Sequence, residues 1–224
     1  MCQKCAKSRT APPAARSGGH LASMGRPPRN EYEHGYYHVH TRGNNKQPVY
    51  LDDLDRHVFL QLLERSQVKY EWVIFEWCLM TTHYHFVLRI GENGLAQGMS
   101  ELNGSYARWS NGRHGRCDHV FGKRYTSNEI TTDAYLLGAC RYVVLNPVRA
   151  GLCSHPREWR WSSYRASAGL EPPRRFHARD VLLGHVRELF ATPTSDGHAV
   201  YRAFIEAGLY AAGPDPVPGT VPGV

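Results

Sequence analysis

Two histidines separated by one tyrosine, His83 and His85, stand in the segment MTTHYHFVL, residues 80–88. Side chains two positions apart in a β-strand point to the same face, about 6.6 Å apart along the strand. Two imidazoles at that spacing can bind one divalent cation between them. Tyr84 and Phe86 would then face the opposite side of the sheet, where the core helices pack. The alternative is that both histidines are exposed on a solvated strand face.

A second pair, His38 and His40, has the same spacing in YYHVHTR, residues 36–42. It lies on a different predicted strand, so it is either a neighbour of the first pair or a competitor for the metal. We favour His83 and His85 because they lie between two strongly apolar runs, which indicates a central and rigid strand. Rigid elements hold metal ligands better than edges or loops do.

A third ligand is expected from the segment CRYVVLNPV, in which Tyr142 and Asn146 are four residues apart. On a helix these two side chains share one face, with Cβ atoms about 5–6 Å apart. The Asn146 amide oxygen can join His83 and His85 on a hard or borderline cation such as Mg²⁺ or Mn²⁺. A phenol beside such a cation is a candidate nucleophile toward phosphorus. Alternatively, Tyr142 is an ordinary helix residue and Asn146 marks the helix end before Pro147.

These side chains need a sheet and a helix to bring them together, and hydrophobic periodicity predicts both. The predicted elements are a strand at 36–42, a helix at 51–67, strands at 70–80 and 83–90, a helix at 95–115, an extended run at 119–130, and a helix at 132–152 that Pro147 stops or kinks. The order β-α-β-β-α-β-α is typical of a ferredoxin-like split βαβ core. The sequence therefore predicts an α+β fold with one antiparallel sheet and helices on one face.

Composition divides the chain into four predicted parts. Residues 1–30 are rich in Ala, Pro, Gly, Ser and Arg and are expected to be disordered, with Met24 as an alternative translation start. Residues 31–153 form the predicted core, and residues 154–210 carry accessory C-terminal helices. The Pro/Gly-rich tail, residues 211–224, is also expected to be disordered.

Charge and hydropathy narrow the class of partner. Lys and Arg number 27 against 20 Asp and Glu, a formal net charge of +7. That excess favours a polyanionic partner, although an ordinary basic protein has the same balance. No apolar run approaches about 18 residues, the length of a membrane span. The six cysteines form no recognisable disulfide framework, so we expect a soluble cytoplasmic protein with no membrane partner.

Four segments, in this order and at these separations, resemble the REP-associated tyrosine transposases: MTTHYHFVL, FGKRYTS, RYVVLNPVRAGL and WRWSSYRA. That family belongs to the single-tyrosine branch of the HUH endonucleases, which also contains small insertion-sequence transposases. The resemblance covers residues 24–170 and includes GRPPRNEYEHGYYHVHTRGNNKQ, which is similar to the start of the family and supports a start at Met24. One departure is visible, because Thr81 and Thr82 stand where the family usually carries Pro-Asn.

The resemblance implies a transposase or endonuclease that nicks and rejoins single-stranded, hairpin-associated DNA. The family's metal-binding histidine pair falls on His83 and His85, its nucleophile on Tyr142, and its polar residue one turn later on Asn146. Tyr142 would form a covalent 5′-phosphotyrosine intermediate with help from Mg²⁺ or Mn²⁺. His40 is then an extra histidine without an assigned role. Insertion-sequence relatives are dimers and REP-associated ones can act as monomers, so monomer and homodimer both stay open.

Basic and amide side chains in or beside predicted loops are the candidates for DNA contacts. They are Arg42, Asn44, Asn45, Arg108, Arg113, Arg116, Lys123 and Arg124. Trp109, Tyr125 and Trp161 can stack unpaired bases, but core packing is the alternative for each and is favoured for Trp161. Two other functions stay open: a non-catalytic nucleic-acid-binding module and a host-adopted transposase relic.

Overall fold

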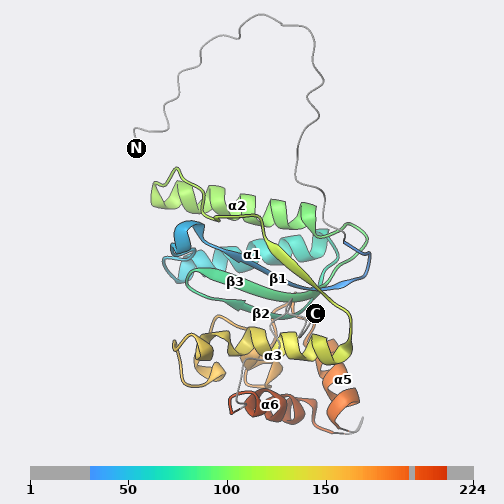
Figure 1. The fold of residues 1–224 in the computed structure, drawn as a ribbon. Coiled ribbons are helices and arrows are strands. Elements are labelled where there is room, and N and C mark those ends of the chain that lie inside the picture. Colours follow the sequence, from blue (N-terminus) through green and yellow to red (C-terminus); the bar gives the residue numbers. More distant parts are fainter. Residues whose placement is uncertain (1–30, 192–194, 211–224) are drawn as a thin grey trace, which may run out of the picture.

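The computed structural model describes residues 31–191 and 195–210 (Figure 1). Its centre is a four-stranded antiparallel sheet with the strand order β2-β3-β1-β4. The strands are β1 (Tyr36–Arg42), β2 (Val73–Leu79), β3 (His83–Arg89) and β4 (Thr126–Ile130). The predicted disordered segments 1–30 and 211–224, and the alternative start at Met24, lie outside the described residues.

Helices connect the strands in the predicted order. The short turn η2 (Asn44–Lys46) and α1 (Asp53–Lys69) join β1 to β2, α2 (Ala96–His114) joins β3 to β4, and α3 (Asp133–Arg149) follows β4. Strand β3 pairs antiparallel with both β1 and β2, so it splits the β1-α1-β2 unit. The predicted α+β fold with a ferredoxin-like core is confirmed.

Polar residues begin the helices on either side of the sheet. Asp52 Oδ1 accepts a hydrogen bond from Asp55 N (3.0 Å) at the start of α1, and Thr132 Oγ1 accepts one from Tyr135 N (3.1 Å) at the start of α3. Helix α2 ends at Gly115, whose φ of 62° favours glycine. The capping residues thus place each helix close to its predicted bounds.

Helices cover both faces of the sheet, whereas the sequence predicts helices on one face (Figure 1). Helices α1 and α2 pack on the face that carries Tyr84 and Phe86, and α3 packs on the face that carries His85 and Val87. Strand β2 is buried along almost its whole length, so both of its sides need an apolar cover. The expectation that the histidine-bearing face stays open is therefore wrong.

Helix α3 continues through Pro147 to Arg149, although a stop or kink is predicted at Pro147. Proline removes only one backbone donor, the one that would have bonded Val143 O. Pro147 stands in the last turn of α3, so the loss of this one hydrogen bond does not end the helix at Pro147. Beyond it, Ala150 N donates to Asn146 O (2.9 Å). The predicted extended run 119–130 is shorter in the structure, where the strand begins at Thr126.

The C-terminal region packs against β2 and α3. It contains η3 (Pro156–Glu158), α4 (Tyr164–Ser167), α5 (Arg179–Phe190) and α6 (Gly197–Ala207). Bridges of Cys78 with Ser162 and of Ile74 with His177 cover the outer edge of β2. No helix in the described ranges is long and apolar enough to cross a membrane.

Glu76 is a carboxyl group buried between β2 and this C-terminal region. Its oxygens accept hydrogen bonds from Ser163 Oγ, from Ser167 Oγ (3.0 Å) and from the Tyr201 hydroxyl (2.7 Å). Burial raises the pKa of Glu76 to about 7, and the three hydrogen bonds oppose that rise. These hydrogen bonds thus link the C-terminal region to β2, the strand next to β3.

Candidate active site

The phenol ring of Tyr142 lies against histidine rings of the sheet. Its centre is 5.7 Å from the ring of His85 and 5.6 Å from the ring of His38, with edge-to-face geometry in both pairs. Helix α3 presents Tyr142 because it packs across β2 and β3 with its apolar residues turned inward. The guanidinium of Arg149, two turns later, lies 5.3 Å from the centre of the same ring. The structure therefore brings together the predicted nucleophile and one predicted metal ligand.

Four histidines meet on this face of the sheet. His40 is the register partner of His85, and their ring centres are 5.4 Å apart. His38 Nε2 lies 2.9 Å from His85 Nδ1, while the rings of His83 and His85 are 5.0 Å apart. The pair on β1 is thus a neighbour of the pair on β3. The equal spacing of the two pairs was visible in the sequence, but the register that joins them was not.

Burial keeps these imidazoles neutral. It lowers the pKa of His85 well below the ordinary value, and neighbouring histidines add to the effect. It also lowers the pKa of His38 to about 3 and, together with the charge of Arg42, the pKa of His83 to about 4. Neutral imidazole nitrogens are the form that binds metal ions.

The hydrogen bonds of His83 and His85 fit a metal-binding role. His83 Nδ1 lies 3.0 Å from Thr82 Oγ1, and His85 Nδ1 is engaged by His38. Metal-binding histidines usually have one ring nitrogen held in this way, so that the other nitrogen faces the ion. Thr82, which departs from the family pattern, therefore orients a predicted ligand.

Asn146 is held by its own helix. Its Nδ2 donates to Tyr142 O (2.9 Å), which leaves Oδ1 as the atom for a metal. Across residues 31–191 and 195–210, no three side chains among His, Cys, Asp and Glu converge as a metal site. The set of His83, His85 and Asn146 as ligands of one metal ion stays a prediction.

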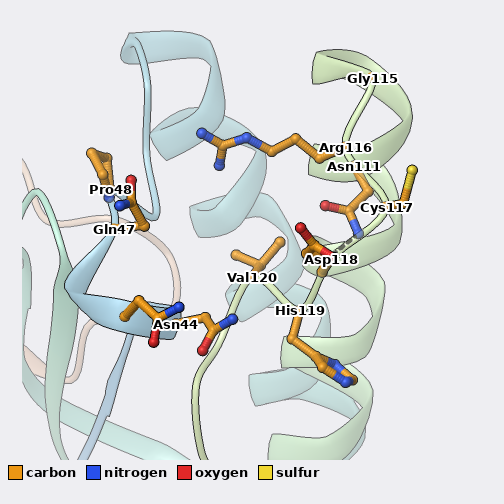
Figure 2. Close-up of a pocket in the computed structure, with 11 residues that line it drawn as sticks. Asn44, Gln47, Pro48, Asn111, Gly115, Arg116, Cys117, Asp118, His119 and Val120 are labelled. Atoms are coloured by element: carbon orange, nitrogen blue, oxygen red, sulfur yellow. Dashed lines mark hydrogen bonds between the residues drawn. The ribbon is translucent and has the colours of Figure 1, made fainter. Parts of the chain in front are cut away.

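The predicted DNA-binding residues lie in several different surroundings. Arg42 is exposed at the end of β1, opposite His83 in the register, and Lys123 and Arg124 are exposed before β4. Arg108 is bonded to Ser105 Oγ on its own helix (3.1 Å). One pocket beyond the end of β1 is lined by three other predicted residues, Asn44, Asn45 and Arg116 (Figure 2).

Arg113 differs from the other predicted DNA-binding residues. Its guanidinium bonds Asp52 Oδ2 (2.6 Å) and Asp55 Oδ1 (2.5 Å). Two carboxylates thus neutralise its charge and tie the end of α2 to the start of α1. We therefore leave Arg113 out of the proposed DNA-binding set.

The aromatic residues considered for base stacking lie mostly in the core. Tyr125 is buried and its hydroxyl donates to Glu31 Oε1 (2.6 Å), and Trp161 is buried. Trp109 is partly buried under the guanidinium of Arg113 (5.5 Å). Core packing, the alternative stated for each, is confirmed for Tyr125 and Trp161.

Known proteins share this sequence pattern and this fold. The family described as "Transposase IS200 like" matches residues 31–146, just over half of the chain. A solved structure, a REP-associated tyrosine transposase bound to a REP hairpin, has a TM-score of 0.56 and 16% identity to the chain. The likeness covers 66% of this chain and 89% of the other, and at that identity it shows the fold. No curated protein matches the chain. The chain belongs to the IS200-like transposase family.

Proposed function

We propose that this protein is a single-tyrosine DNA transposase that nicks and rejoins single-stranded, hairpin-associated DNA through Tyr142. The position of the Tyr142 ring against His38 and His85 carries the proposal. Membership of the IS200-like transposase family supports the same class of reaction. The similar solved structure, a transposase bound to a REP hairpin, supports hairpin DNA as the partner. We expect the reaction to take place in the bacterial cytoplasm, where the DNA lies.

The proposed reaction is a transesterification. Tyr142 Oη attacks the scissile phosphorus, an Oη–P bond forms and the P–O3′ bond breaks. The downstream strand is left on the protein as a 5′-phosphotyrosine. The departing 3′-oxygen takes up a proton, so the net reaction moves the phenol proton to the new 3′-hydroxyl. Attack by a 3′-hydroxyl reverses the step, and joining needs no nucleotide hydrolysis because the phosphodiester energy is conserved.

The proposed cofactor is one Mg²⁺ or Mn²⁺ ion, held by His83, His85 and Asn146. When bound, the ion would neutralise charge that develops on the scissile phosphate. His38 would orient His85 through the 2.9 Å contact between their nitrogens. Arg149 would help to hold the Tyr142 ring, because its guanidinium lies 5.3 Å from the ring centre.

Contacts to the DNA backbone are proposed for five basic residues, of which Arg116 is half-buried and the other four are exposed. They are Arg42, Arg108, Arg116, Lys123 and Arg124, with Asn44 and Asn45 in the η2 turn. Charge-based contacts of this kind give an affinity that falls steeply with salt.

The test is covalent trapping. Single-stranded hairpin DNA labelled at its 3′ end is incubated with the protein and Mn²⁺ and then run on a denaturing gel. The label should move with the protein, because the 5′-phosphotyrosine retains the downstream strand. Tyr142→Phe should abolish the adduct and the nick while changing DNA affinity less than about twofold.

The matched control is Tyr135→Phe, which removes a hydroxyl two turns earlier on the same helix. This variant should still form the adduct. An adduct that persists in Tyr142→Phe would assign the nucleophile to another residue. If the protein bound DNA in a salt-sensitive way that EDTA did not change, and formed no adduct, the result would instead support a non-catalytic nucleic-acid-binding module.

A further inference from the structure

Helix α3 carries Tyr142 and two further polar side chains on one face. Tyr142, Asn146 and Arg149 follow one another at i, i+4 and i+7, the spacing of neighbours along a helix surface. Tyr142 and Asn146 are half-buried, whereas Arg149 is exposed in the last turn of the helix. The proposed nucleophile, the proposed amide ligand and one guanidinium therefore share this face.

The guanidinium of Arg149 turns back toward the nucleophile. It lies 5.3 Å from the centre of the Tyr142 ring, two turns earlier on the helix. A positive charge in the last turn also suits the helix dipole, but the dipole does not require the guanidinium to lie beside that ring. Tyr142 Oη is on the rim of the ring, so a phosphorus bonded to Oη comes within reach of the guanidinium N–H groups. The chain thus brings a positive charge to the position that the proposed reaction gives to the phosphate.

A guanidinium is suited to this phosphate. It is charged at every pH at which the reaction can be measured, and its planar fork of N–H donors matches two phosphate oxygens at once. These oxygens gain negative charge in the transition state of a phosphoryl transfer. Burial keeps His38, His83 and His85 neutral, so these imidazoles bring no positive charge of their own. Arg149 supplies charge on the side of the nucleophile.

The sheet supplies a second arginine from the other wall of the site. Arg42 stands opposite His83 in the register, and its charge, after burial, lowers the pKa of His40 and His83. The sheet carries Arg42 together with the proposed histidine ligands, whereas α3 carries Arg149 together with Tyr142. Arg149 therefore stays beside the phosphorus after the P–O3′ bond has broken, because the phosphorus is then bonded to Tyr142.

We propose that Arg149 is a catalytic residue whose guanidinium binds the non-bridging oxygens of the scissile phosphate. It does so during attack by Tyr142 and again in the 5′-phosphotyrosine. No bond to Arg149 forms or breaks, and its protons stay on the guanidinium. The inference rests on the proposed function, because it adds a group to the mechanism of the same site.

The first experiment measures the rate of adduct formation by the full chain with Mn²⁺ and saturating hairpin DNA labelled at its 3′ end. Arg149→Gln should slow this rate by roughly a hundredfold, because a charge is lost from the transition state. Arg149→Lys keeps the charge without the planar fork and should be slower than the wild type by only about tenfold. The DNA affinity of both variants should stay within about threefold of the wild type.

The ranking of these two variants separates catalysis from support of the tyrosine ring. The planar amide of glutamine can rest on the ring as a guanidinium does, whereas lysine keeps only the charge. A glutamine variant as fast as the lysine variant would therefore overturn the proposal. The matched control is Arg65→Gln, which removes an exposed arginine of α1, on the opposite face of the sheet. Its rate should equal that of the wild type.

The second experiment removes the charge from the DNA instead of the protein. A hairpin probe with a methylphosphonate at the scissile position has no negative charge there for Arg149 to neutralise. On this probe, the ratio of the wild-type rate to the Arg149→Gln rate should fall from roughly a hundredfold to less than about threefold. An unchanged ratio would mean that Arg149 acts on Tyr142 and not on the phosphate, and would overturn the proposal. Where this probe reacts too slowly to measure, the ranking of the glutamine and lysine variants decides.

Melting curves establish that each variant is folded. A normal rate at saturating DNA with a weakened affinity would overturn the proposal, because Arg149 would then be an ordinary contact to the DNA backbone. Either of these failures leaves the proposed function intact, since the wild-type protein still forms its adduct. If the wild-type protein formed no adduct with the unmodified hairpin, both proposals would fail.

Discussion

At the scale of single residues, the candidate site is a cluster of four neutral imidazoles under one phenol. His38 and His85 share a short contact between ring nitrogens, and Tyr142 lies against both rings. A histidine that holds another histidine in place affects metal binding less than the loss of a ligand does. The two histidine pairs should therefore differ in how strongly they affect cleavage.

We expect His83→Ala combined with His85→Ala to reduce cleavage to the level measured without metal, because both nitrogen ligands are lost. His38→Ala should weaken the response to Mn²⁺ by roughly tenfold to a hundredfold, because it removes only the orienting contact to His85. The measurement is the cleavage rate as a function of Mn²⁺ concentration. If His38→Ala reduced cleavage more than the double substitution at His83 and His85, our proposal would have assigned the metal to the wrong strand.

Arg113 and Lys123 should give opposite phenotypes, although both carry positive charge. Arg113→Gln should lower the melting temperature, because it leaves the buried Asp55 carboxylate without its arginine partner. Lys123→Gln should leave the melting temperature unchanged and reduce the slope of log affinity against log salt by about one. Melting curves and binding at several salt concentrations measure the two effects. A reduced salt slope for Arg113→Gln would restore that residue to the DNA-binding set.

At the scale of elements, the link between β2 and the C-terminal helices depends on Glu76. Burial raises its pKa from 4.5 to about 7. A carboxyl group whose pKa is higher in the folded state stabilises the fold fully at low pH, below its unfolded pKa. That stabilisation is lost as the pH rises toward the folded pKa. The three hydroxyl donors around Glu76 reduce this loss but do not remove it.

We expect the unfolding free energy of the wild type to fall relative to that of Glu76→Gln by roughly 3 kcal/mol between pH 4.5 and pH 7. Glutamine keeps the shape of the side chain and does not titrate, so the contributions of the buried histidines cancel in the comparison. Urea unfolding at a series of pH values measures the difference. Parallel stability curves for the two proteins would show that the carboxyl group titrates normally.

At the scale of the whole molecule, the proposed boundary between a core at 31–153 and accessory helices at 154–210 crosses one continuous apolar cluster. Leu182, Val186 and Ile205 from α5 and α6 share this cluster with Val143 and other residues of α3. Helix α3 also carries Tyr142. The C-terminal helices therefore support the face on which the candidate site is built.

A chain shortened after Cys153 should melt more than about 10 °C below the full chain, because it exposes the outer face of α3 and strips Glu76 of its donors. The matched control ends at Tyr210, after α6. It should melt with the full chain, as expected if residues 211–224 are disordered. Melting that is unchanged by the first truncation would show that residues 31–153 are an independent domain.

The sequence by itself determined the local features of this protein. Alternation in MTTHYHFVL places His83 and His85 on one face of a strand, and helical spacing places Tyr142 and Asn146 on one face of a helix. Periodicity and capping residues predicted the order of the elements and the α+β class. These features depend on residues a few positions apart, so they can be read along the chain.

Only the tertiary structure decided which of these faces meet. The β1–β3 register sets His38 against His85, 47 positions later in the chain. The packing of α3 covers the sheet face that was expected to stay open. Asp52, 61 positions earlier in the chain, bonds the guanidinium of Arg113 and neutralises its charge. Contacts between distant segments depend on how sheet and helices close on one another, which no local pattern specifies.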